Sequence, residues 1–463
     1  MNDPNGLVFY QGEYHLFYQY NPFGDKWGHM SWGHAISSNL VHWQYLPVAL
    51  PEEKGVMIFS GSAVVDWRNS SAFGTQSRPP LVAIYTGHSG TNQSQHIAFS
   101  NDRGRTWTKF AGNPVLDIGA RDFRDPKVFW HAPTARWIMV VALPIERRIA
   151  IYGSTNLKQW EHLSEFGPAG AREGIWECPD LFELPVLGSS QRRWVLVVNI
   201  SVSVTGGSGC QYFIGDFDGR AFTNGNPDSR QLWADYGKDF YAAVSWSDLS
   251  PKDERRVWIG WMSNWQYADR VPTGPWRSAQ SLPRELVLKH TSEGLLLAQS
   301  PVRELQHLRT AHFTLQNREL SDTKELLSGP MTEHELLEIK ATFRPGSADE
   351  VGLRIKEDSQ QRTIIAYNRA EKSVFVDRSK SGDSSFSRHF SGRHSAPVEL
   401  EEGTLRLHIY VDRASIEVFA GAGEKVVTEL LFPTNRSDHL AFFARGGTAL
   451  LEKLDVWKLK SIW

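Results

Sequence analysis

Four short hairpin motifs recur along the first half of the chain and limit the fold that it can adopt. They lie at residues 38–43, 100–107, 154–160 and 216–222, and each ends on an aromatic residue. The second copy has the Ser-x-Asp-x-Gly-x-Thr-Trp pattern of an Asp-box hairpin. The closing aromatic residues are 64, 53 and 62 positions apart, a repeat length that suits a four-stranded propeller blade with long loops.

Short apolar runs in the same region predict β-strands. The runs are rich in β-branched and aromatic residues and are bounded by Gly, Pro, Asn or Asp (7–10, 14–18, 81–85, 127–130, 137–142, 194–200 and 257–262). No long amphipathic helix pattern occurs in the first 300 residues. A repeat of roughly 60 residues divides this region into about five units, so we expect a five-bladed β-propeller over residues 1–305.

The residues after about 305 have a different sequence pattern. Alternating apolar and polar segments at 337–343, 351–355, 363–367, 405–411 and 415–419 predict antiparallel strands with one buried face. We therefore expect an all-β chain with a C-terminal β-sandwich over residues 311–463 and a boundary within 300–310. Asp412 and Glu417 lie on strand-and-turn patterns, so we interpret this domain as a scaffold that could add an accessory sugar-binding surface.

Composition excludes several classes of partner. A net charge of −2 and a pI near 6.8 predict no nucleic-acid or anionic-membrane binding, and no apolar run is long enough to span a membrane. The two cysteines, Cys178 and Cys210, and the 16 scattered histidines form no recognisable metal-ligand pattern. The chain is rich in aromatic residues, with 18 Trp, and an indole face can stack on a sugar ring.

Three carboxylates stand in rigid turn settings at the beginning of strand-like runs. Asp3 lies in Asn-Asp-Pro-Asn-Gly, Asp125 precedes a proline in Arg-Asp-Pro, and Glu177 lies in Trp-Glu-Cys-Pro. They are separated by 122 and 52 residues, which is about two blades and one blade. Because equivalent strands of a propeller begin at the same end of its channel, we expect the three side chains to converge on one pocket.

Carboxylates that share a pocket repel one another, which raises the pKa of at least one of them. Glycoside hydrolysis needs such a set, with one carboxylic acid to protonate the leaving oxygen and one carboxylate to attack or to activate water. Arg124 is expected to hold Asp125 ionised and to offer donors to substrate hydroxyls. A calcium cage is the rival interpretation, but none of the motifs has the ligand density of a calcium loop.

These motifs, in this order and spacing, resemble the three signatures of glycoside hydrolase family 32, the β-fructosidase family. The resemblance covers nearly the whole chain, including residues 31–35, 59–62, 282–285 and 411–419. It implies that Asp3 is the nucleophile, Glu177 the acid/base and Asp125 the residue that stabilises the transition state. The reaction would be retaining, with the two reacting carboxylates about 5–5.5 Å apart, and would need no metal or organic cofactor.

The resemblance also implies which residues surround the three carboxylates. Four polar residues match positions that bind the terminal fructosyl unit (Asn2, Gln19, Ser60 and Arg124), three residues match the aromatic wall (Trp27, Phe59 and Trp265), and Tyr241 is expected to line the pocket as well. Cys178 is interpreted as a partly buried thiol that tunes its neighbours. Family members normally have residues before the position of Met1, so we expect a truncated first blade.

Within the family, the stretches 66–74, 206–219 and 264–279 resemble exo-acting fructanases. We therefore expect a β-fructofuranosidase that releases terminal fructose from inulin, levan and sucrose. The alternatives are a fructosyltransferase, an endo-acting levanase or inulinase, an inverting arabinanase-type glycosidase, and a non-catalytic fructan-binding protein. Polymeric substrates favour secretion, whereas the sequence gives no indication of the oligomeric state.

Overall fold

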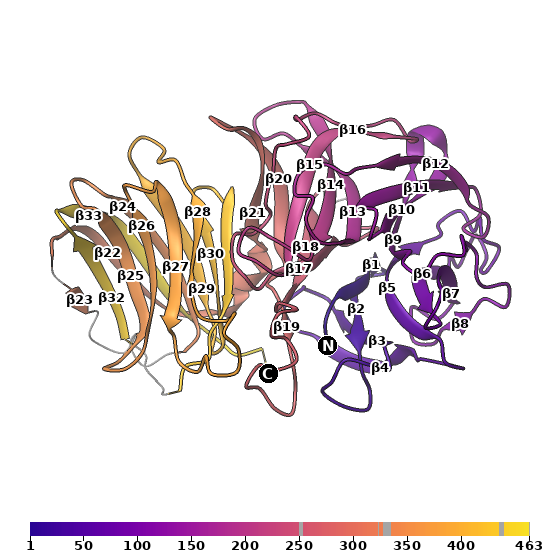
Figure 1. The fold of residues 1–463 in the computed structure, drawn as a ribbon, viewed down its shortest axis with the longest axis horizontal. Helices are drawn as coiled ribbons and strands as arrows, with labels where there is room; N and C mark the ends of the chain where they lie inside the picture. The colour runs from indigo at the N-terminus through magenta and orange to yellow at the C-terminus, as the bar shows by residue number, and fades with distance from the viewer. Residues whose placement is uncertain (250–252, 323, 327–334, 435–438, 463) are drawn as a thin grey trace.

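The computed structural model describes residues 1–249, 253–322, 324–326, 335–434 and 439–462. In these residues almost all regular structure is β-strand, with short 3-10 helices at Ala132–Thr134 and Arg303–Leu308. Strands β1 to β21 form one lobe and β22 to β33 form a second lobe beside it (Figure 1). No helix of the described residues is both long and apolar enough to cross a membrane.

Five successive antiparallel sheets make up the described part of the first lobe. The first two contain β1 (Pro4–Tyr10), β2 (Glu13–Tyr20), β3 (Ser31–Ser37) and β4 (Gln44–Leu50), then β5 (Met57–Val65), β6 (Leu81–His88), β7 (Gln93–Ser100) and β8 (Thr108–Lys109). The third and fourth contain β9 (Arg124–His131), β10 (Arg136–Leu143), β11 (Arg148–Ser154) and β12 (Glu161–Phe166), then β13 (Trp176–Pro185), β14 (Arg192–Ile200), β15 (Gly209–Phe217) and β16 (Phe222–Asn224). The fifth contains β17 (Tyr241–Ser245), β18 (Arg256–Met262), β20 (Arg284–Thr291) and β21 (Gly294–Pro301), and β19 (Ala279–Gln280) also pairs with β18.

The first strand of each sheet lies at the centre of the lobe. Strand β1 packs on β5, β5 on β9, β9 on β13, β13 on β17, and β17 packs back on β1. The five sheets therefore close into a ring, which is the blade arrangement of a propeller. The predicted propeller followed by a β-sandwich is confirmed.

The repeated sequence motif is the turn between the third and fourth strands of the first four blades. In each copy a side-chain oxygen accepts hydrogen bonds from two backbone N–H groups of the turn, which locks the hairpin without help from distant residues. The accepting residues are Asn39, Asp102, Asn156 and Asp218. The fifth blade closes differently, with Thr291 and Gly294 joining β20 to β21, so its sequence lacks the motif.

The innermost strands are bulged near their beginnings, and the bulges aim side chains at the channel. The strand register shifts between Asn5 and Val8 in β1, and between Glu177 and Asp180 in β13. β-Bulges bend a strand and redirect its side chains. Gly6 in the first bulge has φ +55, and a Cβ there would lie 2.6 Å from the ring of Phe17, so this position requires glycine.

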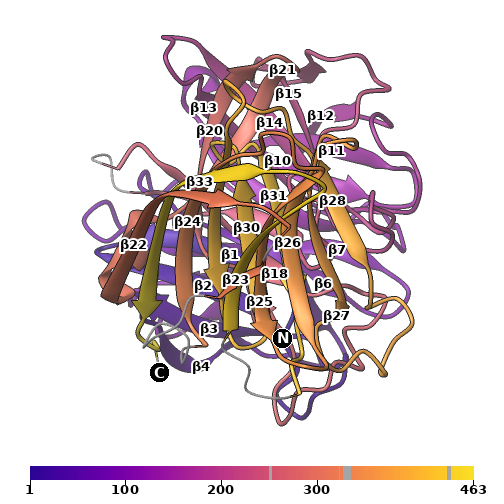
Figure 2. The same cartoon turned by 90° about the vertical axis from the view of Figure 1, so that its left-hand side faces the viewer.

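The second lobe is a sandwich of two six-stranded sheets, as far as the structure describes it. The first sheet contains, in spatial order, β22 (Arg309–Leu320), β33 (Ala449–Leu459), β24 (Leu337–Arg344), β29 (Leu405–Val411), β30 (Ser415–Ala420) and β31 (Lys425–Leu430). The second contains β23 (Lys324–Leu326), β32 (His439–Arg445), β25 (Glu350–Glu357), β26 (Arg362–Asn368), β27 (Ser373–Lys380) and β28 (Arg393–Pro397). Figure 2 shows these strands facing the viewer.

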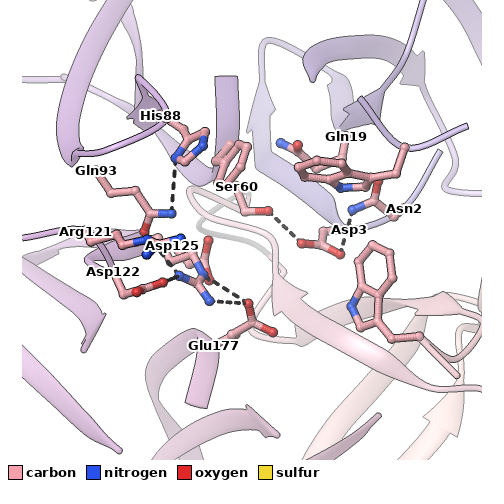
Figure 3. Close-up of a pocket in the computed structure, with 15 residues that line it drawn as sticks. Asn2, Asp3, Gln19, Ser60, His88, Gln93, Arg121, Asp122, Asp125 and Glu177 are labelled. Atoms are coloured by element: carbon pink, nitrogen blue, oxygen red, sulfur yellow. Dashed lines mark hydrogen bonds and ion pairs between the residues drawn. The ribbon is translucent and has the colours of Figure 1, made fainter. Parts of the chain in front are cut away.

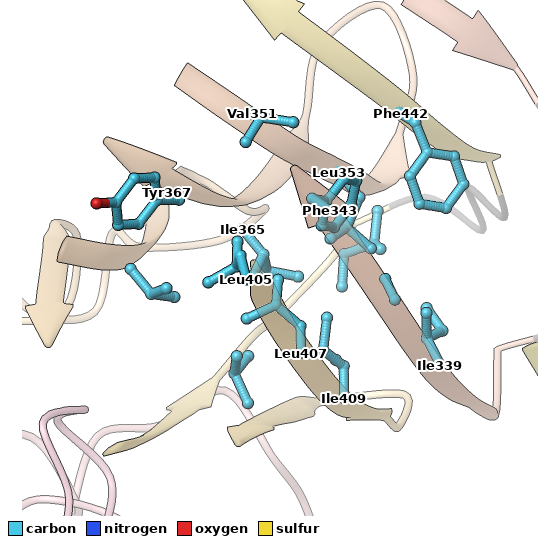
Figure 4. Close-up of a cluster of buried hydrophobic side chains, with 14 of the residues drawn as sticks. Ile339, Phe343, Val351, Leu353, Ile365, Tyr367, Leu405, Leu407, Ile409 and Phe442 are labelled. Atoms are coloured by element: carbon cyan, nitrogen blue, oxygen red, sulfur yellow. The ribbon is translucent and has the colours of Figure 1, made fainter. Parts of the chain in front are cut away.

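Apolar side chains from both sheets fill the space between them (Figure 4). Ile339, Phe343 and Leu407 come from the first sheet, and Leu353 and Phe442 come from the second. Each of these side chains is almost completely buried, as expected for inward-facing positions of alternating strands. The predicted division of the chain between residues 305 and 311 stays a prediction; the short helix Arg303–Leu308 lies between β21 and β22.

A buried arginine joins the two lobes. Arg284 on β20 has no solvent exposure, and its guanidinium donates to Asp235 in the propeller at 3.1 Å and to Glu417 and Thr428 in the sandwich at 2.6 and 2.7 Å. Glu417 also accepts the backbone N–H of Leu282 at 2.7 Å. Every charge in this cluster is therefore paired inside the protein, as buried charges must be.

We expect the substitution Arg284→Met to lower the free energy of unfolding by about 3–5 kcal/mol, because it leaves Asp235 and Glu417 buried without their cation. Urea denaturation would measure the change. The matched control is Arg192→Met, which removes an exposed pair with Glu183 and should cost at most about 1 kcal/mol. Equal losses in the two variants would contradict a stabilising role for the cluster.

Candidate active site

A cavity of about 430 Å³ opens where the innermost strands begin. Its lining comes from blades that are far apart in the sequence, between Asn2 at one end and Trp265 at the other. Asp3, Asp125 and Glu177 all line it, so the structure brings the three expected carboxylates together (Figure 3). They come from the residue before β1, from β9 and from β13.

Asp3 is held firmly by hydrogen bonds. Ser60 Oγ donates to its Oδ2 at 2.7 Å and Asn2 Nδ2 donates to its Oδ1 at 3.1 Å. The backbone around Asp3 pairs with Gln19 on β2, which fixes the direction of the side chain. Burial raises the pKa of Asp3 and the charge of Glu177 raises it further, whereas the donors from Ser60 and Asn2 lower it.

Asp125 is buried beneath the same cavity. It has φ +66, an unusual backbone conformation for a residue other than glycine, and its N–H donates to Thr86 Oγ1 at 3.0 Å. Its Oδ2 accepts the backbone N–H of Cys178 at 3.0 Å. Burial raises the pKa of Asp125 to about 7; Arg124 opposes the rise, and the negative charges of Glu177 and Asp3 add to it.

Arg124 makes its shorter contacts with Glu177, while its charge also favours the ionised form of Asp125, the role expected from the sequence. Its Nε and Nη2 lie 3.0 and 2.9 Å from Glu177 Oε1, whereas its Nε lies 4.0 Å from Asp125 Oδ2. Its Nη1 also donates to Asp122 Oδ1 at 2.8 Å. The bulged strand β9 directs the arginine toward β13, so the adjacent carboxylate in the sequence is not its closest partner.

Two residues lie behind the carboxylates. Tyr241 at the beginning of β17 donates its phenol hydroxyl to Glu177 Oε2, and it lies deeper than the residues that line the cavity. Cys178 is buried, with Sγ 3.7 Å from Asp3 Oδ2 and 3.6 Å from Asp125 Oδ2. Burial and the neighbouring carboxylates hold the pKa of this thiol well above its usual range, so Cys178 stays neutral.

The other expected residues form the wall of the cavity. Asn2, Gln19 and Ser60 lie near Asp3, and Gln19 Nε2 donates to the carbonyl of Ile58 at 3.0 Å. Trp27 and Phe59 meet edge to face with ring centroids 6.0 Å apart. Trp27 and Trp265 are 55% and 42% exposed, which leaves indole surface available to a ligand.

The sequence did not indicate one polar part of the lining, which consists of His88, Gly90, Gln93, Arg121 and Asp122. His88 stacks on Phe59 with centroids 4.6 Å apart, and Gln93 Oε1 accepts from Arg124 Nη1 at 3.2 Å. Arg121 and Asp122 belong to the Arg-Asp-Phe-Arg-Asp motif, so their place in this motif could have indicated that they line the cavity. His88 and Gln93 flank the β6–β7 turn and belong to no motif that would indicate a site.

The raised pKa of Asp125 gives a pH-dependent prediction for stability. A carboxyl group with a raised pKa favours folding below its unfolded pKa of 3.8, and this contribution is lost as the pH rises through about 7. Asp125→Asn should therefore match the wild type near pH 4 and be more stable at pH 8, by on the order of 1–4 kcal/mol.

Urea unfolding at the two pH values would measure this difference, with Asp216→Asn on the exposed surface of β15 as the matched control. A variant that is less stable than the wild type at pH 8 would show that Arg124 more than compensates the charge of Asp125.

In the described residues no group of three His, Cys, Asp or Glu side chains forms a metal site. The arrangement itself suits acid–base and nucleophilic chemistry on a polar ligand. One carboxylate is held by neutral donors, a second is held by an arginine and a phenol, and a third is buried and accepts a backbone N–H. Such a set can attack an electrophilic carbon and exchange protons with a departing oxygen.

Comparisons with known proteins agree over the full chain. Residues 1–301 match the family model for the N-terminal domain of glycosyl hydrolases family 32, and residues 304–458 match the model for its C-terminal domain. A levanase of Bacillus subtilis is 52% identical over 472 residues, covering 100% of this chain and 69% of the levanase. An extracellular exo-inulinase of Aspergillus ficuum is 41% identical, covering 100% of this chain and 93% of that protein.

Solved structures show the same likeness. The crystal structure of exo-inulinase from Aspergillus awamori superimposes with a TM-score of 0.94 at 38% identity, covering 100% of this chain and 96% of the other. A β-fructofuranosidase from Schwanniomyces occidentalis complexed with fructosyl-erythritol gives a TM-score of 0.92 at 34% identity, with coverage of 100% and 95%.

Proposed function

The chain belongs to glycosyl hydrolase family 32, and on this basis we propose that it is a retaining β-fructofuranosidase acting on fructans and sucrose. It would release terminal fructosyl units from inulin and levan. The observation that carries this proposal is the convergence of Asp3, Asp125 and Glu177 on one cavity of a chain that resembles a levanase and an exo-inulinase over its whole length.

The proposed reaction has two steps. In the first, Asp3 attacks the anomeric C2 of the fructosyl unit while Glu177 gives a proton to the departing glycosidic oxygen, and a covalent fructosyl-enzyme forms. In the second, Glu177 takes a proton from water, the water oxygen attacks C2, and Asp3 leaves. Two displacements on C2 give net retention of configuration.

Each remaining residue would support one part of this cycle. Ser60 and Asn2 donate to Asp3 and stabilise its ionised form, the only form that attacks. Asp125 would accept hydrogen bonds from the fructosyl hydroxyls, to which Gln19 and Arg124 would contribute others. Trp27, Phe59 and Trp265 would pack against the apolar C–H surface of the sugar.

Product analysis over time with inulin, levan and sucrose supplied separately would test this function. We expect free fructose as the earliest product from each polymer, and fructose with glucose from sucrose. Larger oligosaccharides at early times would indicate endo action, and new glycosides formed with an acceptor sugar would indicate a fructosyltransferase. Binding without any product would support a fructan-binding protein instead.

A further inference from the structure

We propose that Tyr241 is the residue that positions Glu177 as acid and base, by holding one oxygen of its carboxylate and leaving the other for the reaction. Tyr241 donates to Glu177 Oε2, and Arg124 lies against Oε1. Since Arg124 lines the cavity and Tyr241 does not, Oε1 is the oxygen on the cavity side. The inference rests on the proposed function, because it assumes that Glu177 exchanges protons with the substrate.

Both the packing of its ring and hydrogen bonds between neighbouring strands hold Tyr241 in place. It is 1% exposed and packs against Trp261 with ring centroids 6.4 Å apart. Asn199 joins the strand that carries Glu177 to the strand that carries Tyr241. Its Nδ2 donates to the carbonyl of Cys178 on β13 at 2.9 Å, and its Oδ1 accepts the N–H of Ala243 on β17 at 3.2 Å. One buried amide therefore sets the spacing between Glu177 on β13 and Tyr241 on β17.

The phenol remains a donor over the working pH range. Burial and the charge of Glu177 hold the pKa of Tyr241 well above its usual value, so the hydroxyl keeps its proton. The charged and titratable groups that surround Glu177 are Arg124 and Asp125 on β9, Asp3 before β1, Cys178 on β13 and Tyr241 on β17. Of these, Arg124 and Tyr241 hydrogen-bond to Glu177 directly.

The two donors are not equivalent in the reaction. An arginine has no acceptor atom, so Oε1 can carry a proton only after Arg124 moves onto another partner such as a substrate hydroxyl. Tyr241 has no other hydrogen-bond partner among the contacts of the described residues, so it stays on Oε2. The proton then passes from Oε1 to the leaving oxygen as the C2–O bond breaks, and it returns from water to Oε1 in the second step.

The variant Tyr241→Phe tests this assignment by comparing two substrates. For a fructan, kcat/KM should fall about 10- to 100-fold, as expected for a lost hydrogen bond to a charged group. For p-nitrophenyl β-fructofuranoside, which departs without a proton, kcat/KM should fall less than about 3-fold. The ratio of the two values does not depend on the fraction of folded protein.

The pH profile gives a second readout that a packing defect would not move. Without the Tyr241 donor a charge on the Glu177 carboxylate keeps only the contacts with Arg124, so the pH profile of kcat/KM for the fructan should differ from that of the wild type. The matched control is Tyr212→Phe, which removes a buried phenol from β15 that accepts the N–H of Leu297 away from the cavity. This control should leave both the substrate ratio and the pH profile unchanged.

Equal losses on both substrates with an unchanged pH profile would overturn the inference and make Tyr241 a packing residue. Wild-type rates in Tyr241→Phe would overturn it as well. A wild-type protein that releases no fructose from fructan or sucrose in the same assay would instead overturn the proposed function, and this inference with it.

Discussion

Replacing Asp3 with asparagine is expected to lower kcat for fructose release by about 10⁴-fold or more, because an amide cannot form the fructosyl-enzyme. The side chain keeps its size and one oxygen, which can accept one of the two hydrogen bonds that Ser60 and Asn2 make to separate oxygens of Asp3. Substrate affinity should therefore stay within a few-fold of the wild type. Steady-state rates and titration of tryptophan fluorescence, with Trp27 and Trp265 at the cavity, would measure the two quantities.

Asp216→Asn provides the matched control, since Asp216 lies on the exposed side of β15 and pairs with Arg193. It should leave kcat unchanged. If Asp3→Asn kept more than about a tenth of the wild-type kcat, Asp3 would not be the nucleophile and the assignment of the whole site would fail.

The second large effect is expected for Glu177→Gln. Without the acid, kcat/KM for a fructan should fall by about 10²- to 10⁴-fold, whereas kcat/KM for p-nitrophenyl β-fructofuranoside should be nearly retained. The second step still needs a base, so the fructosyl-enzyme should accumulate on the activated substrate. Mass spectrometry of the protein would then show the added mass of one fructosyl unit on the peptide that contains Asp3.

Glu173→Gln is the control for this variant, because Glu173 is exposed and lies four residues before Glu177. It should behave as the wild type with both substrates. Equal losses of Glu177→Gln on the fructan and on the activated substrate, with no accumulated intermediate, would exclude Glu177 from the acid role.

The parts of the fold that were predictable from the sequence are those that local chemistry determines. The turns at Asn39, Asp102, Asn156 and Asp218 close through bonds to residues two to four positions away, so their pattern is visible in the sequence. The fifth blade lacks this turn and had to be inferred from length. The three carboxylates were equally visible, because each precedes a bulge or a proline at the beginning of a strand.

Contacts between blades were not predictable in the same way. Arg124 was expected beside Asp125 because the two are neighbours in the sequence, yet the bulge in β9 turns the arginine toward Glu177, 53 residues away. Tyr241 was expected in the cavity wall, but it lies one layer deeper. His88 and Gln93 line the cavity from the two ends of the β6–β7 turn, and no local sequence pattern indicates that this turn contributes to the site.

The buried arginines between the lobes have a consequence for how such chains can recombine. Arg284 extends from the propeller to Glu417, and Arg378 extends from the sandwich to Asp239 and to Tyr267, two residues after the cavity-wall residue Trp265. A sandwich grafted from a distant relative would therefore need to bring its own matching charges. Although the two lobes have separate architectures, the residues that form the ion pairs between them are therefore expected to change together.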